Sequence, residues 1–420
     1  MDMPTTTPRG RDLVQGAQRF ARKPGLFARL VAPGFGKILD RIDGALVSGA
    51  IDATLPDGST RRLGGHAPGF ECAVDLRSWN ALLRLASNGS VGWYQAWAAG
   101  EWWSPDPVPL FALFMQHAAR LGDTARAKGP FRQALKLAHL VNRNTPGGAL
   151  RNISAHYDLG NDFYAPWLDA TMSYSSALAV GQDSLEAAQR RKWDALAARL
   201  GDAATVLEIG CGWGALAGAL ASRGCAVTAI SLSDEQLAWA RARQPESIAF
   251  LKQDYRDTGR NSGGRFDAIV SVEMVEALGR EYWPTFMDCI ARNLKPGGRA
   301  AIQFISIREE LFDAYAGSAD FIQAYVFPGG LLIRTSEFRR LAEARGLSWQ
   351  DQRDFGADYA ETLKAWRANF DRAIGEGRLP RGFDPGFCDL WRYYLMYCEG
   401  GFRGGGIDVH QVTLVKQRQA

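Results

Sequence analysis

One short stretch of the sequence constrains the fold more than any other. Residues 205–210, TVLEIG, form an apolar run rich in branched side chains, and CGWGALAGALASRG follows directly. The run predicts a buried strand, and the small residues after it predict a helix. Glycine at Gly210, Gly212 and Gly214 allows positive φ and a close approach of a ligand to the backbone. The segment therefore predicts a strand–turn–helix unit of an α/β sheet.

The alternation of strand and helix patterns continues beyond this unit. The series continues with the strand AVTAISLS, the helix DEQLAWARAR, the segments IAFLKQDY and RFDAIVSVEMVEAL, the helix around YWPTFMDCIARNL, and GGRAAIQFIS. Strands and helices that alternate through short connections form parallel sheets covered by helices. We therefore expect an α/β fold with a doubly wound sheet.

The first third of the chain has a different character. Residues 44–76 are β-rich around a Pro-Asp-Gly turn, and residues 75–89 have helical periodicity, with Asp75 as the expected N-cap and Gly89 as the expected stop. Trp93, Trp97, Trp102 and Trp103 then fall within eleven positions, a density typical of a core or a docking surface. The turn-rich NRNTPGG at 142–148 predicts a boundary near 145. The expected domains are therefore residues 1–145 and 146–420.

Composition excludes several classes of protein. Apolar residues make up 46% of the chain and charged residues 22%, as in ordinary globular proteins. A net charge of +4 is too balanced for a nucleic-acid partner. The sequence shows neither an apolar run near the ~20 residues of a membrane span nor a secretory signal. Six cysteines without a C-x-x-C pair indicate free thiols and a cytoplasmic location.

Residues 1–34 are basic and amphipathic. The segment has two acidic residues and six basic ones, and phenylalanine, leucine and valine side chains are interleaved with the basic residues. The basic residues are Arg9, Arg11, Arg19, Arg22, Lys23 and Arg29. Such a segment suits the surface of an anionic membrane. It equally suits an ordinary amphipathic helix packed on its own domain, and the sequence leaves both interpretations open.

The glycine turn has a distinctive spacing. Its pattern is G-x-G-x-G, and Glu208 lies two positions before the first glycine. This resembles motif I of the S-adenosylmethionine-dependent methyltransferases of class I, which have a Rossmann-like sheet. A tight turn in a non-binding domain is the alternative. The resemblance implies that the following residues bind S-adenosylmethionine: Tyr174, Ser175, Glu208, Gly210, Gly212, Gly214, Ser231, Gln236, Asp254 and Tyr255.

Several separated motifs narrow the family. Segments that include HYDLGNDFYAPWLDATMSYSSA (156–177), SVEMVEALG, DFGADYAETLKAW and YYLMYCEGGFRGGGI resemble those of the cyclopropane-fatty-acyl-phospholipid synthases, over most of residues 44–415. The resemblance implies methyl transfer to the double bond of an unsaturated phospholipid acyl chain, followed by ring closure. It also implies an enzyme at the inner membrane surface, with a smaller N-terminal α+β domain that presents the lipid. Monomer and homodimer both remain open.

The resemblance also assigns catalytic roles. It implies that a bound bicarbonate ion removes the proton that closes the ring, held by a small polar set. Residues matched to the family's catalytic motifs are Ser176, Glu276, Gln303, Ile305, Tyr359 and Cys398. For Cys398, a structural thiol is the alternative. An acid within an apolar run such as VEMVEAL is costly unless it is used, which favours Glu276.

Three positions depart from the family pattern. Ser176 replaces a cysteine, Gln303 replaces a histidine, and Ala277 replaces another histidine. Gln303 still offers a donor to an anion, but it cannot change its protonation state near neutral pH. A methyl-branched product without a ring is therefore an alternative to the cyclopropane. An inactive lipid-binding homologue and a small-molecule O- or N-methyltransferase are further alternatives.

Overall fold

The computed structural model describes residue 10 and residues 32–122, 159–181, 183–260 and 266–418. The chain divides into two compact units that are not contiguous in sequence. The first unit contains Met1–Asn142, Glu310–Pro328 and Pro380–Ile407, and the second contains the segments between and after them. The expected domains were each continuous, whereas two later stretches of the chain return to the first unit.

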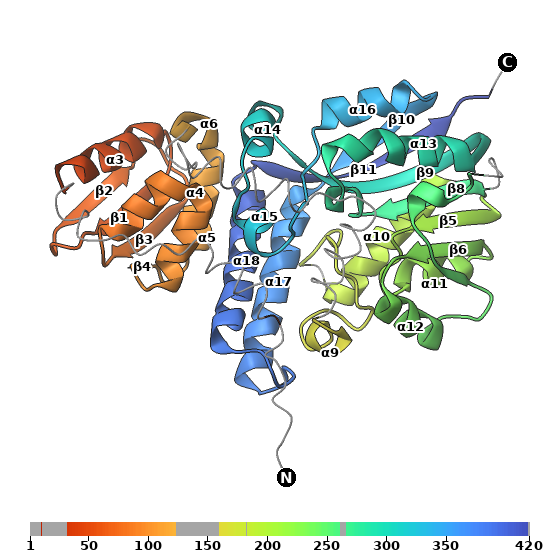
Figure 1. The fold of residues 1–420 in the computed structure, drawn as a ribbon, viewed down its shortest axis with the longest axis horizontal. Coiled ribbons are helices and arrows are strands. Elements are labelled where there is room, and N and C mark those ends of the chain that lie inside the picture. Colours follow the sequence, from red (N-terminus) through yellow and green to blue (C-terminus); the bar gives the residue numbers. More distant parts are fainter. Residues whose placement is uncertain (1–9, 11–31, 123–158, 182, 261–265, 419–420) are drawn as a thin grey trace, which may run out of the picture. The chain divides into compact units, whose positions relative to one another are not determined.

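A four-stranded sheet forms one layer of the first unit (Figure 1). Its order is β2-β1-β3-β4, with β1 antiparallel to β2 and parallel to β3. The predicted Pro-Asp-Gly turn joins β1 to β2, and the Asp57 carboxylate accepts a hydrogen bond from the Ser59 backbone N–H at 2.9 Å. The strands are β1 (Ala50–Thr54), β2 (Thr60–Gly64), β3 (Glu71–Leu76) and β4 (Trp102–Trp103).

Helices complete the first unit. They are α3 (Ala32–Ala45), α4 (Asn80–Ala98), α5 (Val108–Gln116), α6 (Ala118–Leu121), α14 (Glu309–Ala316), α15 (Phe321–Tyr325) and α18 (Pro385–Arg403). Helices α5 and α18 approach closely, because a Cβ added at Gly400 would lie 2.4 Å from Phe111 Cβ. A Cβ at Gly404 would equally lie 2.4 Å from the Ala112 carbonyl oxygen. The C-terminal helix α18 is thereby fitted to the N-terminal helix α5.

Two expected ends of α4 were wrong. Asp75 belongs to β3 and pairs with Arg77, and the position before α4 is taken by Trp79, which makes no side-chain cap. Gly89 lies inside the helix with φ 59° and ψ −138°, so it kinks α4 without ending it. Val91 and Trp93 beyond the kink are buried. Their packing outweighs the helix-breaking preference of one glycine.

The tryptophan-rich segment forms core, as its density indicates. Trp93 and Trp102 stack with ring centroids 4.5 Å apart, and both are buried. Trp97 packs on Tyr393 of α18 at 5.1 Å. Trp103 is the exception, with 47% of its surface exposed.

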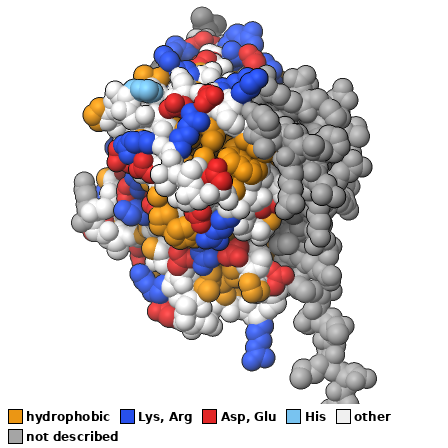
Figure 2. All heavy atoms as spheres, turned by 90° about the vertical axis from the view of Figure 1, so that its left-hand side faces the viewer, with side chains coloured by type: hydrophobic (Ala, Val, Ile, Leu, Met, Phe, Trp, Pro, Cys, Tyr) orange, Lys and Arg blue, Asp and Glu red, His pale blue; other side chains and the backbone are white. Residues whose placement is uncertain are grey.

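Charges of both signs lie side by side on the face shown in Figure 2. Ion pairs of the first unit include Arg61 with Asp40, Arg62 with Asp52 and Glu71, and Arg77 with Asp75. These pairs are exposed, and each contributes little to stability. They keep the described part of this unit's sheet from presenting a field of one sign.

The second unit is built on a seven-stranded sheet of order β10-β11-β9-β8-β5-β6-β7 (Figure 1). Strands β9, β8, β5, β6 and β7 pair with one another in parallel in that order, whereas β10 pairs with β11 in antiparallel orientation. The predicted α/β fold with a doubly wound sheet is confirmed. The strands are β5 (Thr205–Ile209), β6 (Ala226–Ser231), β7 (Ala249–Lys252), β8 (Phe266–Val272), β9 (Leu294–Ile307), β10 (Leu347–Asp354) and β11 (Ile407–Lys416).

Helices lie on both sides of this sheet (Figure 1). Helix α10 packs on α11, and α13 packs on α16. Ser184 caps α10, and Ser233 caps α12 by accepting a hydrogen bond from the Gln236 backbone N–H. The helices are α9 (Asn161–Tyr164), α10 (Leu185–Leu200), α11 (Ala215–Ala221), α12 (Asp234–Arg243), α13 (Trp283–Asn293), α16 (Thr335–Glu343) and α17 (Gly356–Gly375), with 3₁₀ turns η2 (Tyr255–Asp257), η3 (Val275–Ala277) and η4 (Arg280–Tyr282).

The carboxyl ends of β5, β6, β7 and β8 meet at one edge of the sheet, because these strands are parallel. Ligands of open α/β sheets bind at this edge. The glycine turn follows β5 there, and Glu273 follows β8. Val272 of β8 pairs with Gln303 of β9, so the edge also carries Gln303.

Two further predictions concern the N-terminal segment and the cysteines. The membrane hypothesis for residues 1–34 falls almost wholly outside the described residues. Within the described ranges, no helix is long and apolar enough to cross a membrane. All six cysteines lie in the described part of the chain and are free thiols, as predicted.

Candidate active site

The glycine turn leaves room at one position only. Gly210, Gly212 and Gly214 all have positive φ, at 81°, 52° and 84°. A Cβ at Gly210 would lie 2.8 Å from Met274 Cγ, and one at Gly214 would lie 2.8 Å from Ala240 Cβ. A Cβ at Gly212 would have no atom of the described chain within 4 Å. Gly210 and Gly214 are therefore required by packing, and Gly212 borders open space.

Glu208 lies on β5, just before the turn. It is buried, and its Oε2 atom has no hydrogen-bond partner among the described residues. Burial raises the pKa of this carboxyl to about 8. A buried acceptor without a donor is uncommon in proteins and marks a place where a ligand can supply one.

Polar groups at the ends of β6 and β7 lie along the same edge. The Ser231 hydroxyl donates to Gln236 Oε1 at 3.2 Å and accepts from the Ser233 backbone N–H. Asp254 forms a 2.5 Å ion pair with Arg256, and the ring of Tyr255 is buried beside it. The cofactor residues predicted on these two strands therefore flank the glycine turn.

The segment before α10 carries Tyr174 and Ser175. Ser175 Oγ accepts a 2.6 Å hydrogen bond from Lys192 Nζ, and Lys192 is fully buried. Burial lowers the pKa of this lysine to about 8, and the charge of Glu273 opposes the change. Tyr174 packs against the ring of Trp366 at 5.3 Å. The buried ammonium group of Lys192 therefore contacts Ser175 directly.

Three donors converge on the carboxylate of Glu273. The Ser176 backbone N–H donates to Oε1 at 3.0 Å, and Gln303 Nε2 donates to the same oxygen at 2.7 Å. The Tyr359 hydroxyl donates to Oε2 at 2.7 Å. Desolvation raises the pKa of Glu273, and these hydrogen bonds oppose the rise. We call Glu273 and its three donors the carboxylate cluster.

The backbone and a second amide fix this cluster. Glu273 has φ 47°, in the left-handed region that residues other than glycine rarely adopt. Its backbone N–H donates to the Gln303 carbonyl oxygen at 2.9 Å. Gln411 Nε2 donates to Gln303 Oε1 at 3.0 Å, which turns the Gln303 N–H donors toward Glu273.

Glu276 lies one turn further along, in η3. Its Oε1 atom accepts a hydrogen bond from the Ile305 backbone N–H, and its Oε2 atom has no partner among the described residues. Burial and the charge of Glu273 raise the pKa of Glu276 to about 8. The protonated form of Glu276 is therefore favoured at neutral pH.

Five of the six predicted catalytic residues lie in or beside this cluster: Ser176, Glu276, Gln303, Ile305 and Tyr359. Ser176 takes part through its backbone, because its hydroxyl donates to the Ala177 carbonyl. Cys398 lies on α18 in the first unit, where burial and Asp320 raise the pKa of its thiol. Such a thiol stays protonated at neutral pH.

Sequence reasoning missed Glu273 and Lys192. Glu273 lies within the motif SVEMVEALG, in the same apolar run as Glu276, but the resemblance assigns it no role. The cost of placing an acid in such a run applies to both glutamates. Lys192 is one of several basic residues in α10, so the neighbouring sequence does not indicate that this one is buried.

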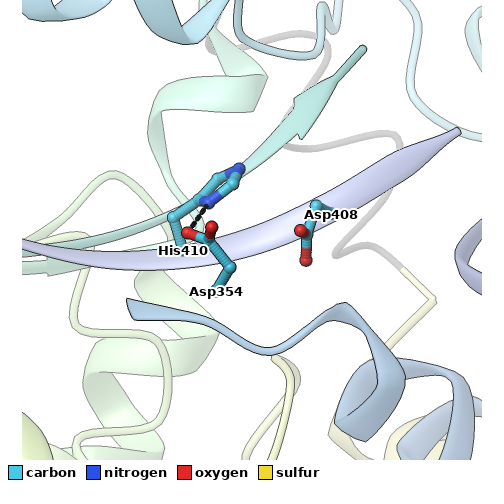
Figure 3. A group of neighbouring side chains, drawn as sticks. All are labelled: Asp354, Asp408 and His410. Carbon is cyan, nitrogen blue, oxygen red and sulfur yellow. Dashed lines mark hydrogen bonds and ion pairs between the residues drawn. The ribbon is translucent and has the colours of Figure 1, made fainter. Parts of the chain in front are cut away.

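A separate group of side chains joins β10, β11 and α17. His410 Nδ1 lies 2.6 Å from Asp354 Oδ1, and its Nε2 atom lies 2.6 Å from Ser306 Oγ. Figure 3 shows Asp354 joined to His410 and Asp408 standing apart. Asp408 accepts from the Gly356 backbone N–H at 2.7 Å. Each of the three side chains already has a hydrogen-bond partner within the protein. The group therefore serves to connect β10, β11 and α17.

A family profile described as "Mycolic acid cyclopropane synthetase" matches residues 146–412. The chain belongs to this family. It is an S-adenosylmethionine-dependent methyltransferase with the class I fold.

Two curated relatives cover most of the chain. The tuberculostearic acid methyltransferase of Mycobacterium tuberculosis is 34% identical over 362 residues, with 80% of this chain and 81% of the relative covered. The cyclopropane-fatty-acyl-phospholipid synthase of Escherichia coli K12 is 32% identical over 359 residues, with 84% and 89% covered. The mycolic acid cyclopropane synthase CmaA1, solved in complex with SAH and CTAB, has a TM-score of 0.58 at 27% identity, covering 64% of this chain and 98% of that one.

The residues of the glycine turn fit S-adenosylmethionine. The open side of Gly212 admits a ligand close to the backbone. A charged amino group, such as that of a methionyl moiety, favours the ionised form of Glu208, whose unpartnered oxygen can then accept its hydrogen bond. Ser231 and Gln236 offer a hydroxyl and an amide for ribose hydroxyls.

Proposed function

We propose that this methyltransferase transfers the methyl group of S-adenosylmethionine to the double bond of an unsaturated phospholipid acyl chain and that the product is a cyclopropane fatty acid. One observation carries the proposal: the carboxylate cluster adjoins the glycine turn. Glu273 is followed by Met274, whose side chain packs against Gly210. A site for negative charge beside a methyl donor suits a reaction in which the acceptor becomes a cation.

The chain's own groups suit such a cation. When bound, S-adenosylmethionine supplies an electrophilic methyl group, which the electron pair of an alkene can attack. The faces of aromatic rings attract a cation, and so do fixed carboxylates in a dry site. The segment before α10 and helix α17 supply a group of packed rings: Tyr164, Trp167, Tyr174, Tyr359 and Trp366.

The product depends on where the cation loses its proton. Loss from the transferred methyl group closes the cyclopropane ring, whereas loss from a neighbouring carbon leaves a methyl-branched alkene. Gln303 lies at the cluster and cannot itself accept a proton at neutral pH. The methyl-branched product is therefore the second candidate.

We also propose that the protein works at the inner membrane surface, with the first unit presenting the lipid. The basic, amphipathic residues 1–34 support this, because each cation near an anionic surface contributes ~1 kcal/mol. Removing residues 1–34 should weaken sedimentation with anionic vesicles, and high salt should weaken it for the full chain. Equal sedimentation of both proteins would contradict the membrane role of this segment.

Lipid analysis tests the reaction directly. Phospholipids from cells that express the protein should gain ~14 mass units, one CH₂, on unsaturated chains. Chromatography that separates ring and branched isomers identifies the product. Cells expressing the Gly212→Val variant provide the control. Unchanged lipids with the wild-type protein, together with methylation of an oxygen or nitrogen in a small molecule, would overturn the proposal.

A further inference from the structure

The proposed function uses the carboxylate cluster only as a site of negative charge and names no group that removes the proton of the cationic intermediate. Building on that function, we propose that the Glu273 carboxylate is the catalytic base that takes the proton from the cationic acyl intermediate. It thereby fills, from within the chain, the place that the sequence resemblance reserves for a bicarbonate ion. The enzyme would then need no separate anion.

The three donors around Glu273 form a complete anion pocket. They come from three parts of the second unit: the segment before α10, strand β9 and helix α17. The Gln303 and Tyr359 side chains donate at 2.7 Å, as expected for charge-assisted hydrogen bonds, and the Ser176 backbone N–H donates at 3.0 Å. A free anion could bind these donors only by displacing the Glu273 side chain.

The pocket also leaves Glu273 able to accept a proton. A carboxylate offers about four acceptor positions. Two donors share Oε1, and the Tyr359 hydroxyl takes one position on Oε2. One position on Oε2 therefore remains for the proton of the intermediate.

The backbone holds this side chain in place at a conformational cost. Left-handed φ at a residue other than glycine persists when the surroundings determine it, and such residues cluster at functional sites. At Glu273 the surroundings are the hydrogen bond from its N–H to the Gln303 carbonyl and the Gln411–Gln303 contact behind it. A glutamate serving only to fill space needs no such support.

Glu273 and Glu276 divide the work of a carboxyl pair. Glu273 has three donors and feels the positive charge of Lys192. Glu276 accepts from the Ile305 backbone N–H and feels the negative charge of Glu273. Unequal environments of this kind leave one member of a pair ionised and the other protonated. Glu273 is the ionised member, and so it is the base.

The step balances without a further reactant. The alkene electron pair forms the new C–CH₃ bond, and the pair of the S–CH₃ bond stays on sulfur, which neutralises the sulfonium. A C–H bond of the transferred methyl then breaks. Its electron pair closes the ring onto the cationic carbon, and its proton binds Oε2 of Glu273. The neutral carboxyl returns this proton to water before the next turnover.

Three proteins test the proposal: the wild type, Glu273→Gln and Glu273→Gly. Asp351→Asn is the matched control, because Asp351 is another acid with positive φ, at 50°, and it is exposed on β10. Methyl incorporation into unsaturated phospholipid vesicles is measured in CO₂-free buffer, with and without added bicarbonate. Calorimetry with S-adenosylmethionine verifies that each protein is folded and binds the donor.

We expect the wild type and Asp351→Asn to be equally active with and without bicarbonate. Both Glu273 variants should lose about 10²–10⁴-fold in rate, the usual contribution of a general base. Glycine suits the left-handed backbone and vacates the pocket, so bicarbonate should restore part of the Glu273→Gly rate but none of the Glu273→Gln rate.

Other results overturn the inference. Dependence of the wild type on bicarbonate would return the role of base to the free ion, and full activity of Glu273→Gln would remove Glu273 from catalysis. Absence of rescue in a Glu273→Gly protein that still binds S-adenosylmethionine would contradict the anion pocket. Absence of methylation by the wild type under every condition would instead refute the proposed function.

Discussion

The glycine turn and the carboxylate cluster lie at one edge of one sheet, yet they differ in how their polar groups are satisfied. At the turn, Glu208 keeps an unpartnered oxygen and Gly212 faces open space. In the cluster, the carboxylate of Glu273 receives three hydrogen bonds from the chain itself. The turn is therefore open to a ligand, whereas the hydrogen bonds of the cluster are supplied by the protein itself.

The largest expected effect lies at the turn. Gly212→Val places a branched side chain in the open space and should weaken binding of S-adenosylmethionine by about 1,000-fold or more, equivalent to ~4 kcal/mol. Calorimetry measures this loss. Gly224→Val is the control, because Gly224 also has positive φ and open surroundings but follows the far end of α11. If both variants bind alike, the turn is not the binding site.

A smaller effect is expected for the protonated partner of the cluster. Glu276→Gln should lower methyl incorporation into all products together by about 10²–10³-fold, because it removes a preorganised group beside the developing cation. Radiolabelled methyl transfer to phospholipid vesicles provides the rate. Full activity in this variant would show that the catalytic centre does not include Glu276.

The third prediction concerns the product ratio. Ser176→Cys combined with Gln303→His introduces an imidazole that can accept a proton where glutamine cannot. We expect the ratio of cyclopropane to methyl-branched chains to change, while total methylation changes less than in Glu276→Gln. The two substitutions belong together because neighbours in one network are rarely additive. An unchanged isomer ratio would mean that these positions do not steer the proton.

The smallest effect is on stability and its dependence on pH. Glu276 has a pKa of about 8 in the folded protein, above its unfolded value, so folding favours its protonated form. The contribution of this raised pKa to the free energy of unfolding is full below pH ~4.3, and it is lost as the pH rises through 8. Glu276→Gln should therefore gain in Tm over the wild type between pH 6 and pH 9, by a few degrees at ~2–4 °C per kcal/mol. A constant difference in Tm would contradict the raised pKa.

Local pattern was enough to predict strands β5 to β9 of the second unit. The run TVLEIG became β5, and DEQLAWARAR became α12 from Asp234 to Arg243, because strand and helix periodicity is written in consecutive residues. The ends of α4 were not predictable in this way. Burial of Val91 and Trp93 carries the helix past Gly89, and that burial depends on partners distant in the sequence.

The candidate site was likewise predictable only in part from local sequence. Motif resemblance brought Ser176, Gln303 and Tyr359 into the candidate set, but it could not show that they all donate to Glu273. Tyr359 and Ser176 are 86 and 97 positions from Glu273 in the sequence, and Gln303 is 30 positions away. These donors meet only when the sheet and α17 are folded. Glu273, the central residue of the cluster, could therefore not be identified from the sequence.

The interleaving of the units has a consequence for synthesis on the ribosome. Helix α5 leaves the ribosome early, but α18, which supplies the glycines fitted against it, begins at Pro385. The second unit likewise lacks β11 until Lys416 is made. Domains usually fold in turn from the N-terminus as the chain grows. Here neither unit can be finished before nearly the whole chain has emerged, and the apolar face of α5 must wait for a partner translated almost three hundred residues later.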